Sequence, residues 1–460
     1  MRPAPAQLIE WLRDARLRTG ALVADLTDAQ LIGPHLATVN PLLWEIGHVA
    51  WFQEKWLLRR DPSYEPVRTD ADALYDSAAV AHDTRWDLRL PSRDQTMRFL
   101  SAVRDRAIEH LSRGAVSPQD SYFALLTIFH EDMHTEAFTY TRQTQGYPPP
   151  PFGTARSVAS RSVTSGEHLT GDVEYPGGAL ALGADRGEPF VFDNEKWAHP
   201  VEVAPFAIAR HPVTQGQFAA FVDDGGYRYD RFWSTEGRRW RAGANVERPI
   251  YWQREGPGRW LRRDFDRWVA LEANWPMIHV SWYEAEAYCR WAGRRLPSEA
   301  EWEAVAASGG VGLPKRRFPW GDGVPTPRHA NLDGHSAGCI DVDALPEGDS
   351  ALGCRQMIGN VWEWTASDFL PYPASSPTLT RSTPSRGSQT TRCCAAGAGR
   401  REPACSATPG ATSIARTGAT SWPASGPARC GHEDHDRHAG AARFAQGESR
   451  QRAPLGTAAA

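Results

Sequence analysis

The 460-residue sequence has no long hydrophobic run and no marked excess of one charge. It contains no stretch of 18 consecutive apolar residues, and the Arg-rich segment 1–20 lacks the apolar centre of a signal peptide. We therefore expect a soluble, cytoplasmic protein. Lysine plus arginine (51) nearly balance aspartate plus glutamate (55), which gives a formal charge of −4 at pH 7. This balance argues against a nucleic-acid or membrane partner.

Cysteine is also scarce, and large apolar residues are almost absent from the end of the chain. Seven cysteines, an odd number that lies mostly late in the sequence, do not suggest a disulfide framework. Residues 374–460 are rich in Ala, Arg, Gly, Pro, Ser and Thr, so they cannot bury enough apolar surface to offset the entropy of ordering. We predict a disordered tail, and our hypothesis for its composition is a shifted reading frame that begins near residue 374.

The length favours two or three domains, of which the first covers residues 1–147. Apolar residues recur there at intervals of three and four along four segments: about 8–26, a segment after Asn40-Pro41, 93–111, and a segment that begins near Ser117-Pro118. Four amphipathic helices with polar connections predict a four-helix bundle, and the core of such a bundle is a natural place for a metal site.

The pattern changes after the proline run 148–151, which ends the last helix. Residues 148–168 are rich in Pro, Ser and Arg and predict a linker. Between residues 169 and 373, short apolar runs alternate with turn residues, and short helices are expected at 215–223 and 282–292. The whole chain is therefore expected to be an α+β multidomain protein, with a loop-rich second domain.

Two histidines in the fourth predicted helix form the first candidate metal site. His130 and His134 are four residues apart, so both imidazoles lie on one face of a helix and can reach the same ion. The helix is apolar around them, and two histidines beside an apolar face are costly unless they bind a metal or form hydrogen bonds. Two histidines with ordinary hydrogen bonds remain the alternative.

Residues 130–134 also fit the H-E-x-x-H pattern of zinc metalloproteases, in which Glu131 would be the general base. That interpretation needs a third ligand at a set position. No H-x-x-G-x-x-H extension follows, and the proline run ends the helix soon afterwards. Zinc-dependent hydrolysis is therefore the weaker alternative.

His48, in the second predicted helix, is the candidate third ligand because its neighbours Trp44, Trp51 and Phe52 place it against a core. Three imidazoles would leave open positions of the kind that non-haem iron(II) uses for oxygen chemistry, although such sites usually hold two histidines and a carboxylate. With three neutral ligands the iron keeps its full positive charge, so that an anionic thiolate or selenolate becomes a favourable ligand. Glu136 is a plausible hydrogen-bond partner of a metal-binding histidine.

Several motifs together resemble a known family. The run Leu43-Trp-Glu-Ile-Gly-His-Val-Ala-Trp-Phe-Gln-Glu54, paired with His130-x-x-x-His134-x-Glu136, is similar to the DinB-like domain of the ergothioneine-biosynthesis sulfoxide synthases (EgtB-like enzymes). The runs 206–214, 276–282, 291–302, 318–321 and 359–365 resemble the formylglycine-generating-enzyme (C-type-lectin-like) domain that is fused to it in that family. The resemblance covers about residues 5–373.

The resemblance implies an Fe(II)- and O2-dependent enzyme that joins a sulfur donor to C2 of the imidazole of hercynine and oxidises the sulfur. It makes His48, His130 and His134 the iron ligands. Trp362 and Trp364 are candidates for an aromatic wall around the quaternary ammonium of hercynine. Tyr372 is the favoured proton donor, with Phe369 as the other residue that aligns with the family's tyrosine. Small molecules are the expected partners: hercynine, O2, and a thiol or a selenosugar.

The chain departs from the family at three places. Met133 stands where a polar residue usually precedes the third iron ligand. Segment 75–88 lacks the family's arginine-rich run for the carboxylates of the thiol, and Arg85 is left as a single candidate anion contact. That change favours the selenoneine synthase (SenA-like) branch. The family's C-terminal motifs are missing after Pro373, so a catalytically decayed metal-binding remnant is the alternative to an active enzyme.

Overall fold

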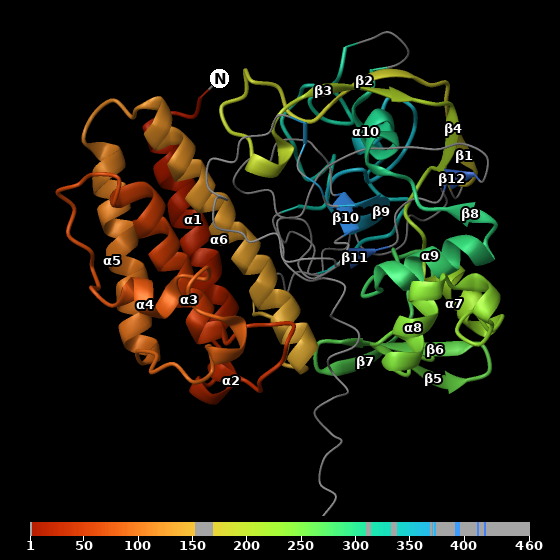
Figure 1. Ribbon diagram of the computed structural model, residues 1–460, viewed down its shortest axis with the longest axis horizontal. Coiled ribbons are helices and arrows are strands. Elements are labelled where there is room, and N and C mark those ends of the chain that lie inside the picture. The colour runs from red at the N-terminus through yellow and green to blue at the C-terminus, as the bar shows by residue number, and fades with distance from the viewer. Residues whose placement is uncertain are drawn as a thin grey trace, which may run out of the picture.

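The computed structural model describes residues 2–151, 169–309, 314–332, 338–368, 370 and 372–373, and the backbone of three short strands further along the chain. The fold is mixed, with an N-terminal helical domain followed by a domain of short strands and helices (Figure 1). The predicted fold class is thereby confirmed. Residues 152–168 of the predicted linker, Phe369, and most of the predicted tail lie outside the described residues.

Four long helices form the N-terminal domain: α1 (Pro5–Val23), α3 (Leu42–Gln53), α5 (Arg93–Ser112) and α6 (Pro118–Gln145). Short helices α2 (Asp28–Ile32) and α4 (Ala71–Tyr75) lie in the connections. The chain signals the bounds of α6 clearly. The side chain of Ser117 accepts a hydrogen bond from the backbone of Asp120, Pro118 occupies the first turn, and Gly146 ends the helix in the left-handed conformation at φ 67°.

The core of this domain consists of the apolar stripes that the sequence predicted. Leu8, Leu12 and Leu22 of α1 are buried against Phe99 and Val103 of α5, within one cluster that also takes in α3 and α6. A short π-helical turn, Glu54–Leu58, follows α3 directly. Among the described residues, no helix is both long and apolar enough to cross a membrane.

The second domain is built from small sheets and short helices. Its strands are β1 (Asp172–Tyr175), β2 (Gly178–Leu182), β3 (His199–Val203), β4 (Phe206–Ala209), β5 (Trp252–Gly256), β6 (Arg259–Asp264), β7 (Arg267–Ala270), β8 (Arg294–Arg295) and β9 (Trp362–Asp368). Its helices are α7 (Gln215–Asp223), α8 (Thr235–Gly243), α9 (Trp282–Trp291) and α10 (Glu299–Ala307). Strands β2 and β3 form an antiparallel pair, and β5, β6 and β7 form an antiparallel meander.

Three short strands lie beyond residue 373: β10 (Arg392–Ala395), β11 (Thr412–Ser413) and β12 (Gly418–Ala419). Strands β10 and β11 flank β9, whereas β12 joins β4 to β8. Parts of the segment for which we predicted disorder thus have backbone pairing with the second domain.

Helix α6 is the element of the bundle that faces the second domain (Figure 1). Near its start, Tyr122 donates a hydrogen bond to the backbone of Val191 and accepts one from Lys196. Near its end, the side-chain amide of Gln143 bonds the backbone of Arg263 and Phe265. Contacts at both ends of one helix dock the second domain along it.

Candidate metal centre

The structure brings His48, His130 and His134 together. His48 lies on α3, and the other two lie one turn apart on α6. One ring nitrogen from each side chain lies within 4.8 Å of the other two, so a single ion can bind all three. The three residues that the sequence selected as metal ligands therefore form a cluster with the geometry of a metal site.

His48 is held in a buried aromatic setting. Its Nδ1 lies 2.8 Å from the backbone carbonyl oxygen of Tyr75, and its ring stacks on Trp44 with 4.8 Å between the ring centroids. Because a carbonyl can only accept, Nδ1 carries the proton and Nε2 keeps its lone pair for a metal. Burial, with a smaller contribution from His134, holds the pKa of His48 well below its usual value. The ring is therefore neutral near pH 7, as a metal ligand must be.

His134 is oriented in the same way by a carboxylate. Its Nδ1 lies 3.4 Å from Oε2 of Glu45, a residue of α3 that is 1% exposed. A carboxylate accepts, so the proton again belongs on Nδ1 and Nε2 faces the cluster. The carboxylate that the structure places at His134 is Glu45, whereas Glu136, the partner that the sequence predicts, accepts a hydrogen bond from Trp362.

His130 is positioned by stacking. Its ring lies parallel to that of Phe52, with 3.6 Å between the ring centroids, and 4.6 Å from the ring of His134. Phe52 thus fixes the plane of the third imidazole. A donor set of three imidazoles suits iron(II), zinc, copper or nickel, so the ligands fit a transition metal without selecting iron.

Glu131 does not take part in this cluster. Its carboxylate pairs with the guanidinium of Arg16 at 3.0 Å and accepts a 2.7 Å hydrogen bond from Thr19, both on α1. A carboxylate already bound to arginine inside the bundle is poorly suited to deprotonate a metal-bound water. The structure therefore argues against the H-E-x-x-H hydrolase interpretation.

Three of the four remaining predicted site residues are buried in different surroundings. Arg85 is buried near the histidine cluster. Its guanidinium lies over the ring of Trp44 at 4.0 Å, and Trp44 in turn stacks on His48. Trp364 packs in the core of the second domain and donates to the carbonyl of Val280. Tyr372 lies in another core cluster of that domain, where its hydroxyl donates to Glu299 at 3.0 Å.

Trp362 reaches the helical domain. Its indole Nε1 donates a 2.7 Å hydrogen bond to Glu136, two residues after His134 on α6. Of the two tryptophans that we predicted for substrate binding, Trp362 is therefore the one that contacts the helix carrying two of the three histidines.

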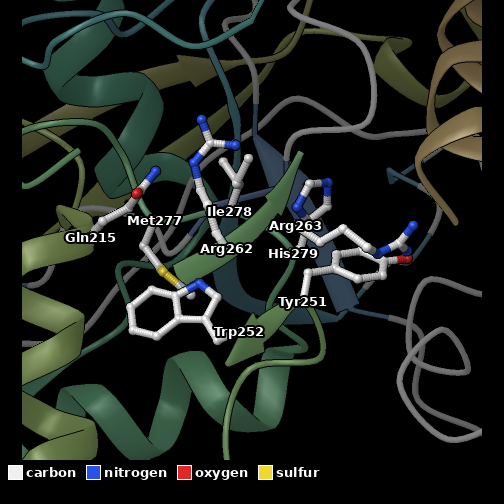
Figure 2. Close-up of a pocket in the computed structure, with 8 residues that line it drawn as sticks. All are labelled: Gln215, Tyr251, Trp252, Arg262, Arg263, Met277, Ile278 and His279. Atoms are coloured by element: carbon white, nitrogen blue, oxygen red, sulfur yellow. The ribbon is translucent and has the colours of Figure 1, made fainter. Parts of the chain in front are cut away.

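A small pocket opens in the second domain between β5, β6 and the segment before α9 (Figure 2). Figure 2 shows Tyr251, Arg263 and His279 together on one side of it. The Tyr251 hydroxyl donates a 3.3 Å hydrogen bond to Thr144 on α6, so this side of the pocket adjoins the domain interface. The residues that line it include none of the predicted site residues. They are Gln215, Tyr251, Trp252, Arg262, Arg263, Met277, Ile278 and His279.

Comparisons with known proteins agree with this architecture. Residues 11–137 match the DinB superfamily, and residues 159–427 match the sulfatase-modifying factor enzyme 1-like domain. The chain is 37% identical over 381 residues to a hercynine oxygenase of Mycolicibacterium thermoresistibile, an alignment that covers 82% of this chain and 83% of that protein. This chain belongs to the hercynine oxygenase family.

Two further relatives show how the similarity is distributed over this family member. The hercynine oxygenase of Mycobacterium tuberculosis is 36% identical over 81% of this chain and 87% of its own length. The formylglycine-generating enzyme of Streptomyces coelicolor is 36% identical over 47% of this chain and 75% of its own length. The hercynine oxygenases thus cover the helical and the second domain together, whereas the similarity to the formylglycine-generating enzyme covers about half of this chain.

Sequence reasoning missed the groups that orient the histidines. Glu45 lies three residues before His48 but serves His134 on another helix, and the partner of His48 is a backbone carbonyl. The buried position of an acidic residue between Trp44 and Ile46, in an apolar helix, was the signal that could have identified Glu45.

Proposed function

We propose that this chain is an Fe(II)-dependent oxygenase that forms a C–S or C–Se bond at C2 of the imidazole of hercynine. In the sulfur reaction, a thiol, the C2–H group and O2 would give a sulfoxide and one water, so that O2 accepts the four electrons released at carbon and sulfur. The observation that carries the proposal is the cluster of His48, His130 and His134 in a chain of the hercynine oxygenase family. The proposal includes the identity of the metal as iron.

The residues around the cluster suit this chemistry. When bound, the iron would supply redox chemistry with O2 and positions for the anionic donor and the imidazole of hercynine. His48 and His134 present Nε2 because Tyr75 and Glu45 hold the protons on Nδ1. The rings of Trp44, Trp51 and Phe52 pack around His48. On the side of the bundle core they would therefore keep water away from the metal.

The further roles of site residues are also proposals. Arg85 would contact the anionic group of the donor, since it is the arginine that lies against Trp44 beside the metal ligands. Trp362 would contribute to an aromatic wall for the quaternary ammonium, where a cation–π contact would contribute about 0.5–2 kcal/mol. The burial of Trp364 in the core of the second domain favours a packing role for that residue. Tyr372 would donate a proton only after its hydroxyl leaves Glu299. Because segment 75–88 retains only one arginine, we favour a selenosugar over γ-glutamylcysteine or cysteine as the donor.

The test is anaerobic reconstitution of the full chain with Fe(II), followed by hercynine, O2 and each donor in turn, with the mass of the product as the readout. A selenium adduct supports the selenoneine branch, and a sulfur adduct supports the ergothioneine branch. Iron binding without product from any donor would support a decayed, metal-binding remnant. His48→Ala is the control and should abolish both Fe(II) binding and product formation, whereas unchanged Fe(II) binding in this variant would contradict the proposed ligand set.

A further inference from the structure

The carboxylate that orients His134 is itself held by a side-chain amide. Glu45 uses Oε2 toward His134 Nδ1, and its Oε1 accepts a 2.8 Å hydrogen bond from Nδ2 of Asn40. Glu45 also lies in the first turn of α3, where the helix dipole favours a negative charge. A carboxylate that is 1% exposed is therefore stabilised by one amide, one imidazole and the start of a helix.

Asn40 connects this carboxylate to Arg85. While its amide nitrogen donates to Glu45, its Oδ1 accepts a 2.6 Å hydrogen bond from the Arg85 guanidinium. An asparagine that donates on one side and accepts on the other has only one orientation that satisfies both neighbours. Asn40 thereby joins the guanidinium to the carboxylate through two hydrogen bonds.

Arg85 belongs to the segment between α4 and α5, not to the metal-binding helices. Its guanidinium donates to the carbonyl of Val80 and lies over the ring of Trp44 at 4.0 Å. It is 8% exposed, so its position is set by these contacts and not by solvent. Two hydrogen bonds, both made by Asn40, thus connect the segment 76–92 to Glu45, the residue that orients His134.

We propose that Arg85, Asn40 and Glu45 form a relay that positions His134 and so couples the segment 76–92 to the affinity and geometry of the metal centre. Glu45 is a positioning residue, since it acts through His134. The proposal rests on metal binding by the three histidines, which is part of the proposed function, but not on the substrates or on iron. Partners that hydrogen-bond a metal-binding histidine commonly change metal affinity by about 10–100-fold.

The experiment titrates Co(II), as the probe metal, into the purified metal-free full chain and records the affinity and the visible spectrum of the bound ion. Glu45→Gln should lower the Co(II) affinity by about 10–100-fold and shift the absorption bands, because an amide cannot match the carboxylate as an acceptor. Glu54→Gln is the matched control. Glu54 is equally buried and directly follows α3, but it pairs with Arg59 and Tyr64. It should leave the Co(II) affinity and spectrum unchanged.

The link to segment 76–92 is tested by a double-mutant cycle. Arg85→Lys retains the charge but loses the fork of donors, so it should lower the Co(II) affinity in the parent chain. In an Asn40→Ala background the same change should have a smaller effect, because the route through Glu45 is already broken and only the contact of Arg85 with Trp44, which stacks on His48, remains. Equal effects of Arg85→Lys in both backgrounds would overturn the coupling.

The outcomes separate this proposal from the proposed function. If Glu45→Gln binds Co(II) with parental affinity and spectrum, the relay is wrong even if the enzyme makes a hercynine adduct. If the parent binds no Co(II), the relay fails together with the three-histidine site. A changed affinity and spectrum in Glu45→Gln, with no product from any donor in the parent, would support the relay and contradict the proposed activity.

Discussion

The indole of Trp362 donates a 2.7 Å hydrogen bond to the carboxylate of Glu136. Trp362 begins β9 in the second domain, and Glu136 lies on α6 two residues after His134. The helix that supplies two of the three clustered histidines is therefore also the helix to which the second domain is anchored, at its middle as well as near both ends. Docking of the domains and geometry of the metal centre depend on the same backbone.

The Trp362–Glu136 hydrogen bond is expected to stabilise the docked arrangement. Hydrogen bonds contribute about 1.5–3 kcal/mol when one group is charged and about 0.5–1.5 kcal/mol when both are neutral. Since glutamine still accepts from the indole, Trp362→Phe and Glu136→Gln should show a coupling energy of about 1 kcal/mol. The measurement is the free energy of urea unfolding for the two single variants and the double variant. Trp364→Phe is the matched control, because its indole donates to Val280 inside the second domain. Its effect should add to that of Glu136→Gln without coupling, and equal coupling for both tryptophans would contradict the assignment.

Gly47 is required next to His48 because of Tyr75. A Cβ at Gly47 would lie 2.2 Å from atoms of the Tyr75 ring, and the carbonyl of Tyr75 accepts the hydrogen bond from His48. Gly47→Ala should therefore lower the free energy of unfolding by about 1–3 kcal/mol and weaken binding of a metal such as Co(II), since Tyr75 must move.

The control for this change is Gly20→Ala in α1, where a Cβ would meet no atom within 4 Å. There the better helix propensity of alanine should raise the free energy of unfolding by up to about 1 kcal/mol and leave metal binding unchanged. Urea unfolding and Co(II) titration measure both effects. A stabilising Gly47→Ala with normal metal binding would show that Tyr75 does not constrain this position.

The contrast between Glu45 and Glu136 shows what sequence periodicity could and could not predict at the site. His130 and His134 share a helix face because their spacing is close to one turn, and this prediction needs no tertiary information. Two residues further on, a helix has rotated by about 200°, and there Glu136 accepts a hydrogen bond from Trp362 of the second domain. Glu45 faces His134 because of the way α3 packs on α6, and this contact between helices is not encoded in the spacing of either one.

The secondary structure also includes elements that local sequence signals predict and elements that they do not. The start of α6 at Pro118 and the helix α7 were predicted closely, because capping residues and apolar periodicity are local signals. The antiparallel meander of β5, β6 and β7 was not predicted as a sheet. Its strands carry many arginines, among them Arg254, Arg259 and Arg267, and the alternation of apolar residues is correspondingly weak.

Arg16 and Glu131 form a buried pair whose role is structural. Arg16 is 5% and Glu131 is 1% exposed, so either partner without the other would be an uncompensated buried charge. Arg16→Ala should lower the free energy of unfolding by about 3–5 kcal/mol, whereas Arg16→Met combined with Glu131→Leu should cost much less. Urea unfolding measures this difference. Co(II) affinity in Glu131→Gln should match the parent, because Glu131 is not part of the histidine cluster. Zinc-dependent hydrolysis by the parent that is lost in this variant would revive the H-E-x-x-H interpretation.

Glu284 is expected to make stability depend on pH between about 4.5 and 7. Burial raises the pKa of its carboxyl to about 7, and this side chain accepts a 2.5 Å hydrogen bond from Tyr227. Since the folded-state pKa lies above the unfolded value, the folded chain binds the extra proton within this window. The free energy of unfolding should therefore fall as the pH rises from about 4.5 to 7, by up to about 3 kcal/mol from this group.

Two variants test whether Glu284 causes this dependence of the free energy of unfolding on pH. One variant should weaken the dependence, and the other should extend it to higher pH. Glu284→Gln removes the titrating group, so the slope should become smaller, although not zero because burial also raises the pKa of Glu303 to about 7. Tyr227→Phe removes a hydrogen bond that favours the charged form of Glu284, so the loss of stability should extend to higher pH. Urea unfolding across pH 4–8 measures both. A slope in Glu284→Gln equal to that of the parent would assign the pH dependence to other groups.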